Sequence, residues 1–258
     1  MRRYSYLFSQ LVRRELRQKY QGSVVGVLWY FVNPLLLMAV YGVMLGPLLK
    51  ATHYSDYPIF ILAGLVVWLF FAQALLAAAT SLVDQASLVS KVRFPRETIP
   101  AASVTVQLVP AVAMLVVLIP VALAIRSNAS ASLLLLVPVL VCLFAFTLGV
   151  ALIAAALHAY FRDVQPILSA VMLPWFFLSG VLFDLQTLPG VESHPWVGSL
   201  LRWVNPVAPF IDAVRSVVYD GRGPGLATLG YVLAAAAVAL GAGVTVFRRL
   251  DRELAVVL

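Results

Sequence analysis

The sequence has 258 residues, of which 62% are hydrophobic and 11% are charged, and this composition leaves no room for a sizeable water-soluble domain. Its formal net charge of +7 would suit a nucleic-acid-binding protein, but the basic residues gather between apolar segments, and this placement argues against nucleic acid as a partner. The single cysteine, Cys142, excludes an intramolecular disulfide and argues against a thiol-based metal site.

The pattern of apolar and basic residues in 1–22 predicts an amphipathic helix that lies at the membrane surface. Its apolar residues fall at helical spacing on one face: Leu7, Phe8, Leu11, Val12 and Leu16. Arg13, Arg14 and Arg17 are displaced from that face, and we assign them with Lys19 to this interfacial helix. Two roles stay open, because the helix either steers the first span along the cytoplasmic leaflet or is a generic anchor. Basic residues without a small-residue cleavage site do not fit a cleavable signal peptide.

Six windows of at least 20 residues contain no Asp, Glu, Lys or Arg, and the charged residues gather between them. About 20 apolar residues at ~1.5 Å rise cover the ~30 Å of hydrocarbon, and a helix satisfies the backbone hydrogen bonds within the segment. We therefore predict an all-α integral membrane fold, one transmembrane domain over residues 1–258. The six expected spans are about Val24–Leu49, Ile59–Ser81, Ile99–Ile125, Leu133–Ala159, Pro166–Phe183 and Leu226–Phe247.

The basic residues predict the orientation of these spans. With both termini on one side, thirteen of the eighteen Lys and Arg residues lie on that side. The positive-inside rule then makes both termini cytoplasmic, together with the loop 82–98, and places 184–222 outside. The external segment holds two apolar pieces, Trp196–Val204 and Val207–Val218, that are too short to cross the membrane. They are either surface helices or a re-entrant pair.

What the sequence lacks limits the source of energy and the chemistry. No Asp, Glu, Lys or Arg lies inside an expected span, which argues against ion-coupled transport. The lysines are Lys19, Lys50 and Lys91, and none follows a glycine, so the chain has no phosphate-binding P-loop. The histidines are scattered, and Asp212 and Arg215, three residues apart, can pair on one helix face. We predict no catalytic residue, no metal site and no cofactor bound by this chain.

Several blocks of the sequence carry a family resemblance. They are Arg14–Ser23 followed by Gly26–Trp29, Asn33-Pro34, Lys91–Glu97, Tyr160–Asp163, and Leu178–Phe183 with Asn205-Pro206 and Arg215 downstream. Read together, these blocks resemble the membrane subunit of ATP-binding-cassette exporters of the type-2 permease class. Within that class the chain is similar to the branch that exports O-antigen, teichoic acid and other lipid-linked polysaccharides. The likeness covers nearly the whole chain in the expected order.

The resemblance implies a homodimer of this subunit with two copies of a separate cytoplasmic ATPase, which binds ATP and Mg. The loop 82–98 would be the coupling segment that docks on the ATPase, although topology alone also requires a basic cytoplasmic loop. Its candidate contact residues are Asp84, Lys91, Arg93, Phe94, Pro95, Arg96 and Glu97. Arg162 and Asp163 would form either a second contact or a local pair that closes a helix end.

By the same resemblance, the external segment 184–222 forms an outer gate, and the conduit lies between two protomers, lined by the first and fifth spans. Aromatic rings there would offer flat faces to a sliding sugar chain, although aromatics at span ends also serve as interfacial belts or packing. The candidates are Trp29, Tyr30, Phe31, Tyr41, Trp175, Phe176 and Phe177. The expected function is export of a lipid-linked polysaccharide across a bacterial inner membrane. The alternatives are a drug or small-lipid permease, a membrane-embedded enzyme of lipid-linked glycan metabolism, and a passive channel.

Overall fold

The computed structural model describes residues 2–20, 26–45, 56–91, 94–126, 131–184 and 195–257, and every regular element in these ranges is a helix. The α-helices are α1 (Arg2–Tyr20), α2 (Trp29–Leu45), α3 (Tyr57–Asp84), α4 (Ala86–Lys91), α5 (Thr98–Val106), α6 (Leu108–Arg126), α7 (Leu136–Tyr160), α8 (Val164–Leu178), α9 (Pro195–Val204), α10 (Ala208–Val218) and α11 (Leu226–Val257). Two short 3-10 helices, η1 (Gly26–Leu28) and η2 (Ala131–Leu135), precede α2 and α7.

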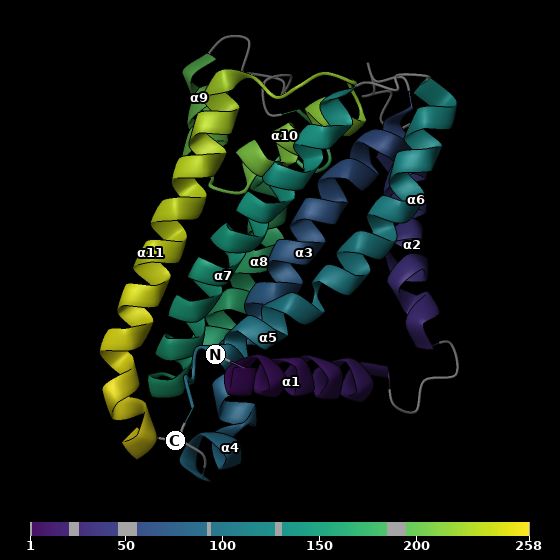
Figure 1. Cartoon of the computed structure of the whole chain (residues 1–258). Coiled ribbons are helices and arrows are strands. Elements are labelled where there is room, and N and C mark those ends of the chain that lie inside the picture. Colours follow the sequence, from purple (N-terminus) through teal and green to yellow (C-terminus); the bar gives the residue numbers. More distant parts are fainter. Residues whose placement is uncertain are drawn as a thin grey trace.

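Four helical stretches in the described ranges are long and apolar enough to cross a membrane: Tyr57–Asp84, Thr98–Ile125, Ser132–Tyr160 and Leu226–Asp251. They form an elongated bundle, with α1 lying across one end and α9 and α10 at the other (Figure 1). We call these the α1 end and the α9 end. The prediction of an all-helical, multi-pass membrane protein is confirmed. The expected first and fifth spans correspond to α2, with 17 residues, and α8, with 15, so the count of six stays a prediction.

Two expected spans are not continuous helices over their predicted length. The third is divided at Gln107 into α5 and α6, and Pro110 offers no N–H to the Val106 carbonyl at this break. The fifth ends at Leu178 rather than near Phe183, because the chain turns at Gly180, whose φ is 69°. Glycine adopts this left-handed conformation without the steric cost that a Cβ would add.

Helix α3 is the centre of the bundle, and 83% of its most apolar 18-residue window is buried. An aromatic cluster joins it to α7 and α8. The Trp175 ring lies edge-on to Phe71 and Trp68, with centroids 5.2 and 6.2 Å away, and Phe146 stacks on Phe71 at 5.8 Å. Rings of this size fill the space between helices that smaller side chains would leave open.

Helices α7 and α11 approach each other closely through small residues. A Cβ built on Gly149 would overlap the backbone of Ala239, and one built on Gly243 would overlap the backbone of Gly149. Ala239 and Gly243 are four residues apart and therefore lie on one face of α11. Since helix association in lipid depends on such close packing, we infer that α7 and α11 form a tightly packed pair.

A second apolar cluster lies at the α1 end and joins α1, α3, α4, α5, α7 and α11. Its buried residues are Leu11, Leu82, Val89, Ile99, Ala102, Leu152, Ala155, Ala156, Ala159 and Phe247. Leu7, Phe8 and Val12 of α1 pack against it, so the apolar face predicted for residues 1–22 contacts protein in this structure. A helix is present where the interfacial helix was predicted, and its place at a membrane surface stays a prediction.

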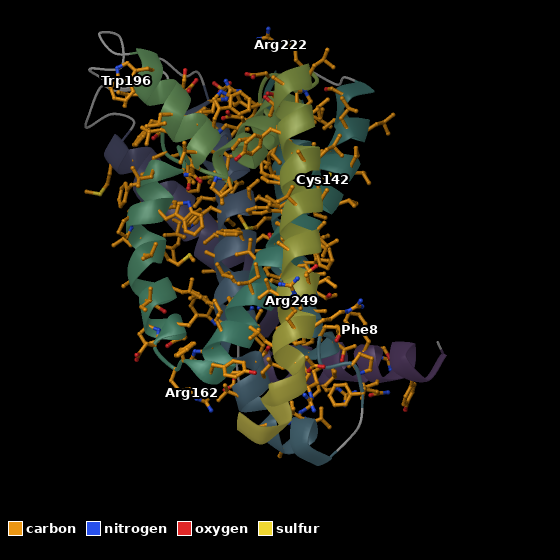
Figure 2. All side chains as sticks on the ribbon, turned by 90° about the vertical axis from the view of Figure 1, so that its left-hand side faces the viewer. Phe8, Cys142, Arg162, Trp196, Arg222 and Arg249 are labelled. Carbon is orange, nitrogen blue, oxygen red and sulfur yellow. The ribbon has the colours of Figure 1, made fainter. Side chains whose placement is uncertain are left out.

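The α9 end contains two short helices at almost the positions predicted for the external apolar pieces. Trp196 and Arg222 lie at this end, whereas Phe8 and Arg162 lie toward the opposite end (Figure 2). Helix α10 packs against α3, α7 and α11, and nine of its eleven residues are buried. The pair α9–α10, which we call the outer hairpin, is therefore built into the bundle.

Candidate functional site

The predicted coupling segment begins where α3 ends. Asp84 is exposed at the last turn of α3, and Gln85 separates α3 from the short helix α4 with a non-helical φ of −112°. Val89 of α4 is buried in the α1-end cluster, and Phe94 packs partly buried against the same cluster. Arg93 and the side chain of Lys91 lie outside the described residues. Pro95 follows Phe94 and is partly buried.

Arg96 and Glu97 bind the far end of the chain rather than pointing away from it. The Arg96 Nη1 donates to the carbonyl oxygen of Asp251 at 2.7 Å and to its Oδ1 at 3.1 Å. The Glu97 Oε1 lies 3.6 Å from Arg248 Nη2. We call these two ion pairs the clasp. Sequence reasoning missed it, because 155 residues separate Arg96 from Asp251 and neither carries a local signal for the other.

The last residue of α7 adds a third contact to the same region. The Tyr160 hydroxyl donates to the Leu250 carbonyl at 2.8 Å. Arg162 and Asp163 are exposed in the turn that begins α8. Their predicted contact with an ATPase, or with each other, stays a prediction.

Helix α1 is fixed to the bundle by two polar residues, the partly buried Glu15 and the exposed Lys19. The Glu15 Oε1 accepts hydrogen bonds from Ser103 Oγ at 2.8 Å and Gln85 Nε2 at 3.1 Å. Lys19 Nζ donates to Gln107 Oε1 at 2.8 Å. Burial raises the pKa of Glu15, and its two hydrogen bonds oppose that effect; burial also lowers the pKa of Lys19. The arginines predicted for this helix, Arg13, Arg14 and Arg17, are exposed.

Arg215 of α10 is the centre of the predicted gate region. Its guanidinium donates to the carbonyl oxygens of Gly180 at 2.7 Å and Phe60 at 3.3 Å, and also to that of Val181. It lies over the Phe60 ring, 3.6 Å from the ring centroid, and the residue is only 6% exposed. Arg215 therefore joins the outer hairpin to the start of α3 and to the turn after α8. The flat, five-donor guanidinium suits several carbonyls at once.

Asn205, between α9 and α10, makes a second set of ties to α8. Its Oδ1 accepts from Trp175 Nε1 at 3.0 Å and from the Val207 backbone N–H at 3.1 Å. Its Nδ2 donates to the Leu178 carbonyl at 3.0 Å and to Ser179 Oγ at 2.9 Å. This buried amide thus has partners for both donors and its acceptor, as buried polar groups require.

In the structure Asp212 shares a cavity with Arg215, the partner suggested by its spacing, and also contacts Arg202 of α9. The Asp212 Oδ2 lies 2.8 Å from Arg202 Nε of α9. Both side chains line a polar cavity of about 190 Å³ at the α9 end, together with Phe60, Asp184, Arg215, Ser216, Tyr219 and Asp220. Spacing of three residues permits a pair on one helix, but the packing of α9 on α10 brings a second arginine to the carboxylate.

The aromatic residues proposed for a conduit divide into two groups. The side chains of Trp29 and Phe177 are 50% and 46% exposed, on α2 and α8 respectively. Trp175, partly buried, and Phe176, buried, pack in the core beside Trp68. Phe31 is half-buried and borders a small gap between α2, α3 and α6. The side chains of Tyr30 and Tyr41 lie outside the described residues.

The polar side chains at these sites can hold helices together and can release them during a conformational change. Among the described residues, no three His, Cys, Asp or Glu side chains lie close enough together to hold a metal ion. The polar groups described above make ties between helices: the clasp and Glu15 at the α1 end, and Arg215 and Asn205 at the α9 end. Such ties fix relative helix positions and can break and re-form during a conformational change.

Comparisons with known proteins show one matching family and several similar transport proteins. A family model described as ABC-2 type transporter matches residues 6–219. An O-antigen export system permease protein of Myxococcus xanthus is 31% identical over 252 residues, which is 98% of this chain and 95% of the relative. A Klebsiella pneumoniae protein with the same description is 27% identical, covering 84% of this chain and 82% of its own length. A polysialic acid transport protein of Escherichia coli is 23% identical, covering 95% and 93%.

Proposed function

The chain belongs to the ABC-2 type transporter family, and on this premise we propose that it is the membrane subunit of a polysaccharide exporter. Its cargo is a lipid-linked glycan of the O-antigen, teichoic acid or galactan type, moved from the cytoplasm to the outer face of the inner membrane. The observation that carries this proposal is the 31% identity, over 98% of the chain, to an O-antigen export permease. The polysialic acid transport relative supports the same class of cargo.

We propose further that a separate ATPase drives the cycle, with two copies bound to a dimer of this chain. ATP and Mg bind in that partner, since the sequence has no P-loop lysine. The α1 end is the cytoplasmic end, in keeping with the basic residues of 1–22 and 82–98. With α2 and α8 as the first and fifth of six spans, both termini are cytoplasmic.

The conduit in this proposal runs between the exposed faces of α2 and α8 in two protomers. These faces carry large apolar side chains that the rest of the subunit leaves uncovered: Leu35, Leu36, Val40, Val43 and Met44 on α2, and Ile167, Val171, Leu173, Phe177 and Leu178 on α8. Exposed aromatics such as Trp29 and Phe177 offer ring faces to sugar C–H groups without holding the hydroxyls. The outer hairpin, held by Arg215 and Asn205, then closes the external mouth.

Co-purification tests this proposal. The tagged chain, extracted from native membranes in mild detergent, is expected to bring a nucleotide-binding subunit with it. Phe94→Ala is expected to weaken that association, because Phe94 lies in the coupling segment, partly buried over the α1-end cluster. Tyr6→Ala is the control, since Tyr6 is a 68% exposed aromatic residue of α1, outside the coupling segment and the turn at Arg162. Recovery of the chain without any ATPase under these conditions would contradict the proposal.

A further inference from the structure

We propose that α11 is the connecting element between the coupling segment and the outer hairpin, with Arg248 and Asp251 as positioning residues for the coupling segment. The inference rests on the proposed function, because it assigns the route by which movement caused by the ATPase reaches the external mouth. It requires α11 to be joined to both sites and to move as one body between them.

The first join is the clasp. Arg248 and Asp251 are three residues apart and therefore lie on one face of α11, while Arg96 and Glu97 are neighbours in the coupling segment. The two pairs have opposite polarity: arginine to aspartate at 3.1 Å, and glutamate to arginine at 3.6 Å. Sliding the segment along α11 so as to exchange these partners would bring Arg96 toward Arg248 and Glu97 toward Asp251. The clasp thus fixes the register of the segment on α11.

Apolar packing and one hydrogen bond also hold this end of α11 in place, next to the clasp. Phe247 is fully buried in the α1-end cluster with Val89 of α4, and Phe94 and Leu250 pack against that cluster. The Tyr160 hydroxyl binds the Leu250 carbonyl at 2.8 Å. Since close-packed side chains transmit displacement, movement of the coupling segment carries the end of α11 with it.

The second join lies at the other end of α11. Arg202 Nη2 of α9 donates to Thr228 Oγ1 at 3.3 Å, and the Tyr231 hydroxyl donates to the Trp203 carbonyl at 3.0 Å. The rings of Trp203 and Tyr231 are also in contact, with centroids 5.4 Å apart. From Thr228 to Asp251 the helix is continuous, a length of about 35 Å at 1.5 Å per residue. One rigid helix therefore contacts both sites.

Helix α3 offers a competing route, because it also runs from the coupling segment to the outer hairpin. Its last residue is followed by Gln85, whose backbone leaves the helical conformation before α4 begins. Movement of α4 can therefore be absorbed at this joint. The clasp, in contrast, joins the coupling segment to α11 directly, and the close contact at Gly149 and Gly243 couples α11 to α7.

A charge exchange in the complete complex tests this inference. Arg96→Glu, Asp251→Arg and the double variant are reconstituted with the ATPase in proteoliposomes. The measured quantity is the amount of glycan moved per ATP hydrolysed, alongside ATPase binding and thermal unfolding. Each single variant is expected to lower this ratio by about threefold to tenfold, and the double variant to restore most of it. Arg249→Glu inverts a neighbouring charge outside the clasp and is expected to leave the ratio near that of the wild type.

At the opposite end, Tyr231→Phe keeps the ring and removes the hydroxyl that binds the Trp203 carbonyl. It is expected to lower the ratio while ATPase binding and the rate of ATP hydrolysis stay near those of the wild type, a result that a purely structural role would not give. Failure of the exchange to restore coupling, or an unchanged ratio in Tyr231→Phe, overturns the inference. If the wild-type complex itself moves no glycan with ATP, the proposed function fails, and that result is recognised before any variant is compared.

Discussion

Removing the guanidinium of Arg215 is expected to destabilise the outer hairpin more than any other single loss of charge at the α9 end. Arg215 donates to three backbone carbonyls, and two of them, Gly180 and Val181, lie outside any helix. Arg215→Met keeps the length and apolar stem of the side chain and removes all its donors. The substitution leaves those carbonyls without this partner in a buried site.

The magnitude follows from the number of lost bonds. A hydrogen bond from a charged donor contributes about 1.5–3 kcal/mol, so the loss of all three is expected to cost about 3–5 kcal/mol in total, since part of the loss is offset when the charge no longer has to be buried. For a chain of this size, that loss corresponds to a fall in Tm of roughly 6–20 °C. Arg215→Lys is expected to lie between, because one ammonium cannot reproduce the planar fork.

Thermal unfolding of the purified protein measures this effect, and Arg222→Met is the matched control. Arg222 is an exposed arginine at the same end, so its loss is expected to leave Tm within about 2 °C of the wild type. A Tm for Arg215→Met equal to that of Arg222→Met would refute the assignment of Arg215 as the tie that holds the hairpin.

Three further predictions concern packing, protonation and the conduit. Gly149→Leu is expected to separate α7 from α11 and to lower the free energy of unfolding by about 1–3 kcal/mol, measured by thermal unfolding. Gly230→Leu is the control and is expected to have little effect, because a Cβ at Gly230 meets open space. Burial raises the pKa of Glu15 above its ordinary 4.5, so its contribution to stability is present below that pH and is lost as the pH rises through the raised pKa. Glu15→Gln is expected to flatten this part of the stability–pH profile, and an unchanged profile would show that Glu15 does not cause it. Phe176→Ala is expected to lower Tm, because Phe176 is packed in the core. Phe177→Ala is expected to reduce glycan transport while Tm is retained, because Phe177 is exposed on α8. A lowered Tm with normal transport in Phe177→Ala would contradict the assignment of the exposed α8 face to the conduit.

The sequence was sufficient to predict the structural features that depend on residues close together in the chain. The charge-free windows predicted the apolar helices, since the cost of burying charge in lipid is paid locally, segment by segment. The two apolar pieces between residues 184 and 222 correspond to α9 and α10, within one residue at all four of their ends. The division of the third span at Gln107 accords with Pro110, which follows it by three residues.

The polar ties between helices could not be predicted in the same way. Glu15 lies on an apolar helix face, and its partner Ser103 is 88 residues away. The Asp212–Arg202 pair was not suggested by helical spacing, because the packing of α9 on α10 brings this arginine to the carboxylate beside Arg215. The end of α8 at Leu178 was missed for a related reason: hydrophobicity continues to Phe183, but the left-handed conformation of Gly180 ends the helix before it.

Transport measured with and without the ATPase tests the central claim most directly. The chain is reconstituted in proteoliposomes with a labelled lipid-linked glycan, either alone or with its co-purified ATPase, and accessible glycan is followed after ATP addition. We expect glycan to cross only when chain, ATPase and ATP are all present. ATP-independent crossing with the chain alone, or chemical turnover of the glycan by it, would contradict the assignment as an exporter subunit.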